Sequence, residues 1–191
     1  METKVRRSAE ERKEILQHYI LENLGNEPAV YCGTYKKYNN CSLDGAWLNL
    51  KAFDSYDEFL EICALLHDDE ENPEFMFQDF QGFPEALYSE SCMSEETFDD
   101  ILIYCDACRE DRKAFDAFCE YRNDVSFTEA MELYMGYFDS KEDFVENQVN
   151  EMFDLDSMMG NLSCYFDYAR YARDLFITDY LFCDGYVFRR V

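Results

Sequence analysis

The feature that most constrains this chain is a stretch of 57 residues, from position 52 to position 108, that contains no lysine or arginine. Across the wider interval 52–169 there are 32 acidic and 5 basic residues, a net charge of -27, and the remaining ends together carry +2. Soluble proteins usually intersperse charges of both signs. Because like charges repel, such a chain folds only if its acids face solvent above a strong apolar core.

The composition can supply that core. The 191 residues are 48% hydrophobic and include 17 phenylalanines and 15 tyrosines, whereas disordered acidic segments are poor in aromatic residues, so we expect a globular protein. The nine cysteines are odd in number and no secretion signal is evident, which predicts reduced thiols that act as small apolar residues. No apolar run is long enough to span a bilayer, so we predict a cytoplasmic protein without a membrane partner.

Periodicity and capping signals predict a mixture of helices and strands. Serine followed three residues later by glutamate, as at Ser8, Ser55 and Ser126, is typical of a capping box at a helix start, and Ser94 and Ser140 are further caps. The predicted helices cover residues 8–24, 56–67, 95–108, 112–121, 127–135, 141–153 and 164–176. The predicted strands cover residues 29–35, 45–50 and 75–83, followed by a final hairpin that turns at Asp184–Gly185.

The order of these elements predicts an α+β fold, arranged as three small domains in a row. The first domain, residues 28–92, would hold a small antiparallel sheet with a helix. The second, residues 93–125, would be helical, and the third, residues 126–191, would combine helices with a β-hairpin. A basic helical extension, residues 1–27, would precede the three domains.

Motifs for catalysis are scarce. The two histidines, His18 and His67, lie in no zinc-ligand spacing, and neither a phosphate-binding loop nor a nucleophile elbow occurs. Cys105 and Cys108 form a CxxC, but they fall within a predicted amphipathic helix and no second ligand pair accompanies them, so packing is the favoured interpretation. We therefore expect no enzymatic activity and no cofactor.

The loop that begins at Asp154 is the best candidate for calcium among the many acids. It has aspartate at loop positions one and three, but Met158 occupies position five and Tyr165 replaces the bidentate glutamate at position twelve. The pattern fails as an EF-hand, and no metal site is expected. An enzyme that uses clustered carboxylates to bind a divalent metal is the weakest of the alternatives.

The remaining distinguishing property is an electrostatic field. Duplex DNA carries one negative charge per roughly 1.7 Å of its axis, so a net charge of -27 corresponds to about 46 Å of duplex. A surface of this kind attracts DNA-binding grooves and repels nucleic acid itself. We interpret the charge as mimicry of DNA. The alternative is an acidic interaction or chaperone-like module that binds basic proteins.

Three segments also carry a resemblance to a known family. They are "AVYCGTYKKYNNCSLDGAWLNL" (29–50), "FMFQDFQGFPE" (75–85) and "NLSCYFDYARYARDLFITDYLFCDGYVFRR" (161–190). These segments resemble the ArdA antirestriction proteins that mobile genetic elements carry, most distinctively in "GTYKKYN", "GAWL" and "YARDLF". The similarity covers most of the chain from about residue 29 onward.

The resemblance implies an elongated protein of three small domains that forms a homodimer through its C-terminal domain, residues 126–191, and whose acidic surface imitates bent B-form DNA. It implies binding to the methyltransferase core of a type I restriction-modification enzyme, without catalysis and without a nucleic-acid partner. The acids expected on the mimic surface are Asp57, Glu58, Glu61, Asp68, Asp69, Glu70, Glu71, Glu74, Asp79, Glu95, Glu96, Asp99, Asp100, Asp139, Glu142, Asp143, Glu146, Glu151, Asp154 and Asp156. The residues expected near the dimer contact are Tyr165, Tyr168, Tyr171 and Leu175, for which the domain core is an equally weighted alternative.

Two features need an explanation beyond the resemblance. The extension before residue 29 is not required by the family core, and it could cap the first domain, neutralise an acidic patch or contact the partner. Its basic residues are Lys4, Arg6, Arg7, Arg12 and Lys13. The run "LHDDEENPEF" (66–75) is predicted to be a segment of outward-facing, unpaired acids that begins at Asp68.

Overall fold

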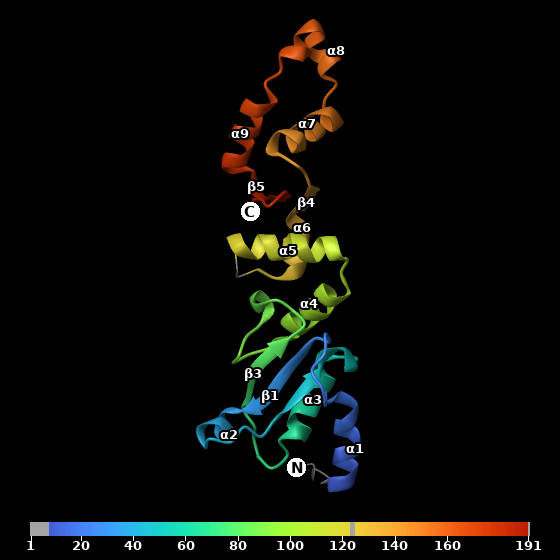
Figure 1. Ribbon diagram of the computed structural model, residues 1–191, viewed down its shortest axis with the longest axis vertical. Coiled ribbons are helices and arrows are strands. Elements are labelled where there is room, and N and C mark those ends of the chain that lie inside the picture. Colours follow the sequence, from blue (N-terminus) through green and yellow to red (C-terminus); the bar gives the residue numbers. More distant parts are fainter. Residues whose placement is uncertain (1–7, 123–124, 191) are drawn as a thin grey trace, which may run out of the picture. The chain divides into compact units, whose positions relative to one another are not determined.

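The computed structural model describes residues 8–122 and 125–190, which form helices and two antiparallel sheets, and it confirms the α+β class (Figure 1). The strands are β1 (Ala29–Thr34), β2 (Ala46–Asn49), β3 (Phe75–Gln81), β4 (Tyr134–Tyr137), β5 (Tyr180–Cys183) and β6 (Tyr186–Arg189). The α-helices are α1 (Ala9–Tyr19), α2 (Tyr35–Asn39), α3 (Tyr56–Leu66), α4 (Glu95–Asp106), α5 (Arg109–Tyr121), α6 (Phe127–Leu133), α7 (Lys141–Met152), α8 (Leu155–Met159) and α9 (Tyr168–Thr178). The 3-10 helices are η1 (Leu50–Ala52), η2 (Glu85–Leu87) and η3 (Gly160–Tyr165).

The chain divides into two compact units, which we call unit 1, up to Ala107, and unit 2, from Cys108 onward. Helix α4 belongs to the first unit and α5 to the second by the contacts that each makes. The division into three domains stays a prediction.

The sheet of unit 1 has the order β2-β1-β3, so the three strands expected from the sequence form one antiparallel sheet. Val30 of β1 lies opposite Leu48 of β2, and both are fully buried. Helix α3 packs on this face, because the ring of Phe59 stacks on Phe77 of β3 with centroids 5.7 Å apart. Helix α4 joins the same core through Phe98, whose ring lies 5.4 Å from that of Phe59.

The first helix is shorter than predicted, because its last residues take part in the sheet of unit 1. Helix α1 ends at Tyr19, and Ile20 is extended and bridges Leu48 on the free edge of β2. The next residue continues this contact, since the backbone N–H of Leu21 donates to the carbonyl of Trp47 at 2.9 Å. The extension therefore caps an edge strand that would otherwise expose unpaired backbone groups.

The predicted serine caps are confirmed. Side-chain oxygens accept the backbone N–H three residues on at Ser8, Ser55, Ser94, Ser126 and Ser140. The reciprocal bond of a capping box is present at the first and the fourth of these serines. At Ser55 it is absent, because Glu58 instead accepts from the backbone N–H of Asp54 at 2.8 Å and from the Tyr19 hydroxyl at 2.6 Å.

Unit 2 has a sheet of order β4-β6-β5. The hairpin between β5 and β6 turns at Asp184 and Gly185 as predicted, with φ angles of 48° and 91° that a type I′ turn requires. Strand β4 was missed: a helix was predicted over 127–135, but α6 ends at Leu133 because Tyr134 pairs with Phe188 of β6.

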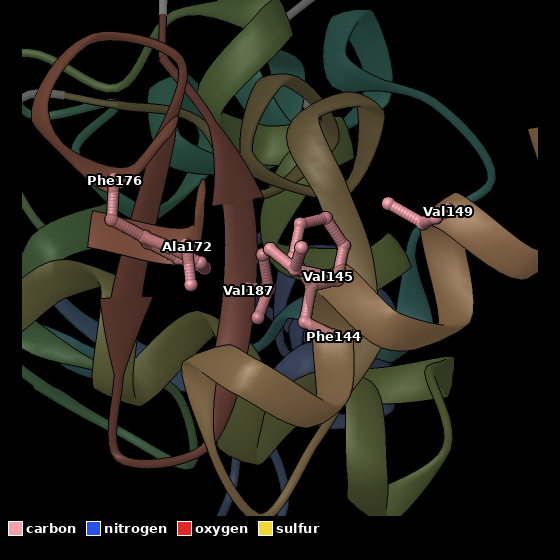
Figure 2. Close-up of a cluster of buried hydrophobic side chains, with 6 residues drawn as sticks. All are labelled: Phe144, Val145, Val149, Ala172, Phe176 and Val187. Carbon is pink, nitrogen blue, oxygen red and sulfur yellow. The ribbon is translucent and has the colours of Figure 1, made fainter. Parts of the chain in front are cut away.

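The cores of unit 2 lie on the two faces of this sheet. Val187 points to a cluster with Phe144 and Val145 of α7, which is shown in Figure 2 together with Ala172 and Phe176 of α9. The neighbouring residue Phe188 points the other way, onto Phe118 of α5, with ring centroids 4.5 Å apart. Consecutive residues of the central strand thus serve different cores, as the alternation of side chains in a strand requires.

Candidate partner-binding surface

Most of the acids predicted for a partner-binding surface are exposed. Of the twenty, seventeen are exposed, Glu58 is half-buried, and Glu70 and Asp100 are buried. Helix periodicity explains the exposed ones on α7, where Glu142, Asp143 and Glu146 face solvent while the apolar side chains of the same helix enter the core.

The run 66–75 is not a row of unpaired acids, which corrects the prediction from the sequence. Asp68 forms an ion pair with Arg12 of α1, and Asp69 accepts from the Lys37 ammonium of α2 at 2.9 Å. The hydrogen bond from Lys37 lowers the pKa of the Asp69 carboxyl. Both cations come from the part of the sequence that precedes the cation-free stretch.

The next acid in the run is held inside the unit. The Glu70 carboxylate accepts the hydroxyl of Thr34 at 2.7 Å, and both side chains are buried. Three of the four consecutive acids are exposed, and Glu71 alone among these three has no ion pair in the described part of the chain. The run therefore ties the loop after α3 to β1 and α2, and it offers little free charge.

A buried polar cluster below this loop was not found from the sequence. The Lys37 ammonium donates to His67 Nδ1 at 3.2 Å, and His67 Nε2 donates to the carbonyl of Cys32 at 3.3 Å. A hydrogen bond with the Cys63 thiol lowers the pKa of Cys32, although burial opposes this, and burial raises the pKa of Cys63. The strand alternation of Cys32 and Thr34 was the available signal.

The cysteines are unpaired thiols, but only some of them are small core residues as predicted. Cys32 and Cys63 are fully buried, whereas Cys41, Cys92, Cys108 and Cys164 are exposed. The expectation that a CxxC lies inside one helix was wrong. Helix α4 ends at Asp106, and Cys108 caps the next helix, where its sulfur accepts the backbone N–H of Asp111 at 3.4 Å.

The residues predicted near a dimer contact differ in exposure. Tyr165 is 81% exposed and Tyr171 is 38% exposed, but Tyr168 and Leu175 are half-buried and pack against the core of unit 2. Large apolar side chains that precede Tyr165 in the sequence are also exposed, which was not predicted, and together with Tyr165 we call them the apolar patch. They are Met152, Phe153, Met158, Met159 and Leu162.

Most of the apolar patch lies in an uncharged segment, because residues 157–166 contain no acidic or basic side chain. It borders a groove of about 620 Å³ between the end of α7, α8, η3 and the start of α9. Two of the acids that line the groove form local hydrogen bonds: Asp154 accepts from the Ser157 hydroxyl at 2.6 Å, which lowers the pKa of Asp154, and Asp156 accepts from Ser163 at 2.5 Å. Among the described residues, no group of His, Cys, Asp and Glu is arranged to hold a metal ion.

A comparison with protein families identifies the family of this chain. A family described as "Antirestriction protein (ArdA)" matches residues 30–188 of the 191. The chain belongs to the ArdA antirestriction family. A comparison with curated proteins found no match.

Membership of the ArdA family makes the protein an antirestriction protein. The ArdA match begins after α1. It covers the strands β1 to β6 except Ala29, the first residue of β1, and Arg189, the last residue of β6. Lys4, Arg6 and Arg7 of the extension lie outside the described residues. In the part of the chain that the structure describes, no helix is long and apolar enough to cross a membrane.

Proposed function

We propose that this protein blocks type I restriction-modification enzymes by occupying their DNA-binding groove with its acidic surface. The observation that carries the proposal is the exposure of nearly all the predicted surface acids in an antirestriction protein whose residues 52–108 contain no cation. The function needs no catalysis and no cofactor. It places the protein in the cytoplasm, where a restriction enzyme meets the DNA of an incoming mobile element.

The binding would be electrostatic and collective. A cationic groove is steered toward a single-signed surface, and each exposed carboxylate adds little by itself because solvent and salt screen it. Acids four residues apart on the same helix, such as Asp57 and Glu61 of α3, have Cβ atoms about 5 to 6 Å apart. That spacing is on the scale of neighbouring phosphates along a DNA backbone, so rows of such pairs support mimicry.

The proposal also includes a homodimer joined through unit 2. The patch around Tyr165 supports it, because two polyanions can meet without strong repulsion only where charge is absent. Residues 157–166 are such a place, and they carry Met158, Met159 and Leu162 with large exposed areas. Dimerisation would double the length of the acidic surface offered to one enzyme.

A competition experiment tests the function. Purified protein is added to a type I methyltransferase core bound to a labelled duplex, and release of the duplex is measured from low to physiological salt. We expect displacement at low salt that weakens steeply as salt is added. A matched panel of small basic proteins separates mimicry from a general acidic module: equal affinity for every cationic protein, or no displacement at low salt, would contradict the proposal.

A further inference from the structure

The N-terminal segment is built into unit 1 although the family match begins only at residue 30. Leu16 of α1 is buried, and Tyr19 stacks on Phe53 of unit 1 with centroids 4.7 Å apart. Ile20 and Leu21 continue along the edge of β2. These contacts fix α1 beside α3. Several of the acids assigned to the partner-binding surface lie on α3 or in the loop that follows it.

Two of these acids are occupied by the segment itself. Arg12 pairs with Asp68, and each side chain of this pair is 37% exposed. The Tyr19 hydroxyl donates to Glu58, and this bond is the largest of the effects that lower the pKa of the Glu58 carboxyl. We call Glu58 and Asp68 the held pair.

Two acids of α3 itself have no such partner among the residues described. Asp57 and Glu61 are exposed, and no hydrogen bond or ion pair of their side chains occurs in the described part of the chain. They lie four residues apart, on the same side of α3. We call them the free pair.

We propose that α1 selects which acids of unit 1 a cationic groove can use: the free pair contributes to binding, and the held pair does not. This inference rests on the proposed function. A held carboxylate must give up its present partner before it can serve a new cation, and Arg12 compensates its field at short range. Arg12 is therefore a positioning residue, which acts on the surface through Asp68.

Two double variants with the same change of charge test the division. Asp57→Asn with Glu61→Gln neutralises the free pair, and Glu58→Gln with Asp68→Asn neutralises the held pair. In the duplex-displacement assay we expect the first to weaken inhibition about three- to ten-fold and the second to change it less than about two-fold. Equal losses would overturn the inference. If the held-pair variant does not fold by circular dichroism, Asp68→Asn and Glu61→Gln are compared as single variants.

Arg12 has its own matched control, because Lys13 is the next residue of α1 and has no ion pair among the described residues. Arg12→Ala and Lys13→Ala remove the same charge, but only the first releases Asp68. We expect Arg12→Ala to strengthen binding about two- to five-fold more than Lys13→Ala. That surplus should disappear in the Asp68→Asn background. Identical effects of the two substitutions, or a surplus that survives Asp68→Asn, would contradict the role given to Arg12.

A second probe keeps this test separate from the proposed function. Binding of a fluorescent ten-residue lysine peptide is measured by anisotropy for the same variants at low salt. The free-pair variant should lose more affinity than the held-pair variant here as well. If wild-type protein fails to displace DNA from the methyltransferase, the proposed function is wrong, and the lysine peptide still decides whether α1 divides the acids.

Discussion

Tyr19 of the N-terminal helix stacks on Phe53, with ring centroids 4.7 Å apart and planes inclined by 17°. Phe53 in turn meets Phe59 edge-on at 5.3 Å, so the Tyr19 ring is joined to the aromatic core of unit 1 through Phe53. The contact joins a segment that the ArdA match does not include to one that it does. Of the roles considered for the extension, capping the first domain and neutralising acid are the two for which contacts exist.

Removal of the Tyr19 ring should destabilise unit 1. We expect Tyr19→Ala to lower the free energy of unfolding by about 1 to 3 kcal/mol, because it removes buried aromatic surface and a stacked pair. Tyr19→Phe keeps the ring and loses only the bond to Glu58, so its cost should be about 1 kcal/mol. Urea denaturation measures both, with the exposed neighbour Gln17→Ala as control. A Tyr19→Ala cost no larger than that of the control would show that the stacking contributes nothing.

The hairpin of unit 2 should tolerate no side chain at Gly185. Its φ is 91°, and an added Cβ would lie 2.4 Å from Cε2 of Tyr137. We expect Gly185→Ala to cost about 2 to 4 kcal/mol from the left-handed backbone and the clash together. Gly25→Ala, where φ is not positive and an added Cβ meets nothing within 4 Å, is the control. Equal melting temperatures for the two variants would show that neither backbone strain nor the clash contributes.

Stability should fall in acid through the pair of Lys37 and Asp69. Because the pKa of Asp69 is lowered in the folded protein, the unfolded chain binds more protons below its ordinary pKa of about 4. The contribution is complete above that value and is lost as the pH falls through the lowered pKa. Asp69→Asn should flatten this part of the pH profile by less than about 1 kcal/mol, since the Asp69 side chain is 59% exposed and solvent screens its charge. Glu71→Gln is the control, and an equal flattening by it would contradict the assignment.

The apolar patch of unit 2 should control self-association. We expect Tyr165→Ser to shift the protein from dimer to monomer, because the substitution removes a large exposed aromatic side chain without opening the core. Sedimentation velocity measures the mass, and circular dichroism checks the fold. Tyr38→Ser in unit 1, where the tyrosine is 52% exposed, is the matched control. An unchanged sedimentation coefficient for Tyr165→Ser would remove this patch from the interface.

Local signals in the sequence predicted most of the fold. Serine caps placed the helix starts, and the Asp184–Gly185 turn placed the last hairpin, because these motifs act within a few residues. Strand β4 was invisible to the same reasoning, since Tyr134 becomes extended by pairing with Phe188, more than fifty residues later. The end of α1 failed for the same reason, because Leu48 recruits Ile20 to a sheet edge.

The candidate site was predicted only as a set of acids, without their partners. Net charge and helix periodicity are properties of short segments, so the exposed face of α7 was correctly foreseen. The engagement of Asp68 by Arg12 and of Asp69 by Lys37 depends on how α1 and α2 pack beside the loop after α3. Periodicity contains no information about such contacts. Tyr165 was predicted near a dimer contact, but the exposure of Met152, Met158 and Leu162 was not predicted.

The position of β6 in its sheet affects the order in which the two units can fold during translation. Both of its neighbours, β4 and β5, precede it in the sequence, and the central strand carries Val187 for one core and Phe188 for the other. Unit 2 therefore cannot close either core until this last strand has been synthesised, whereas every element of unit 1 is complete by Ala107. Vectorial synthesis favours folding of the first unit while the second is still being translated.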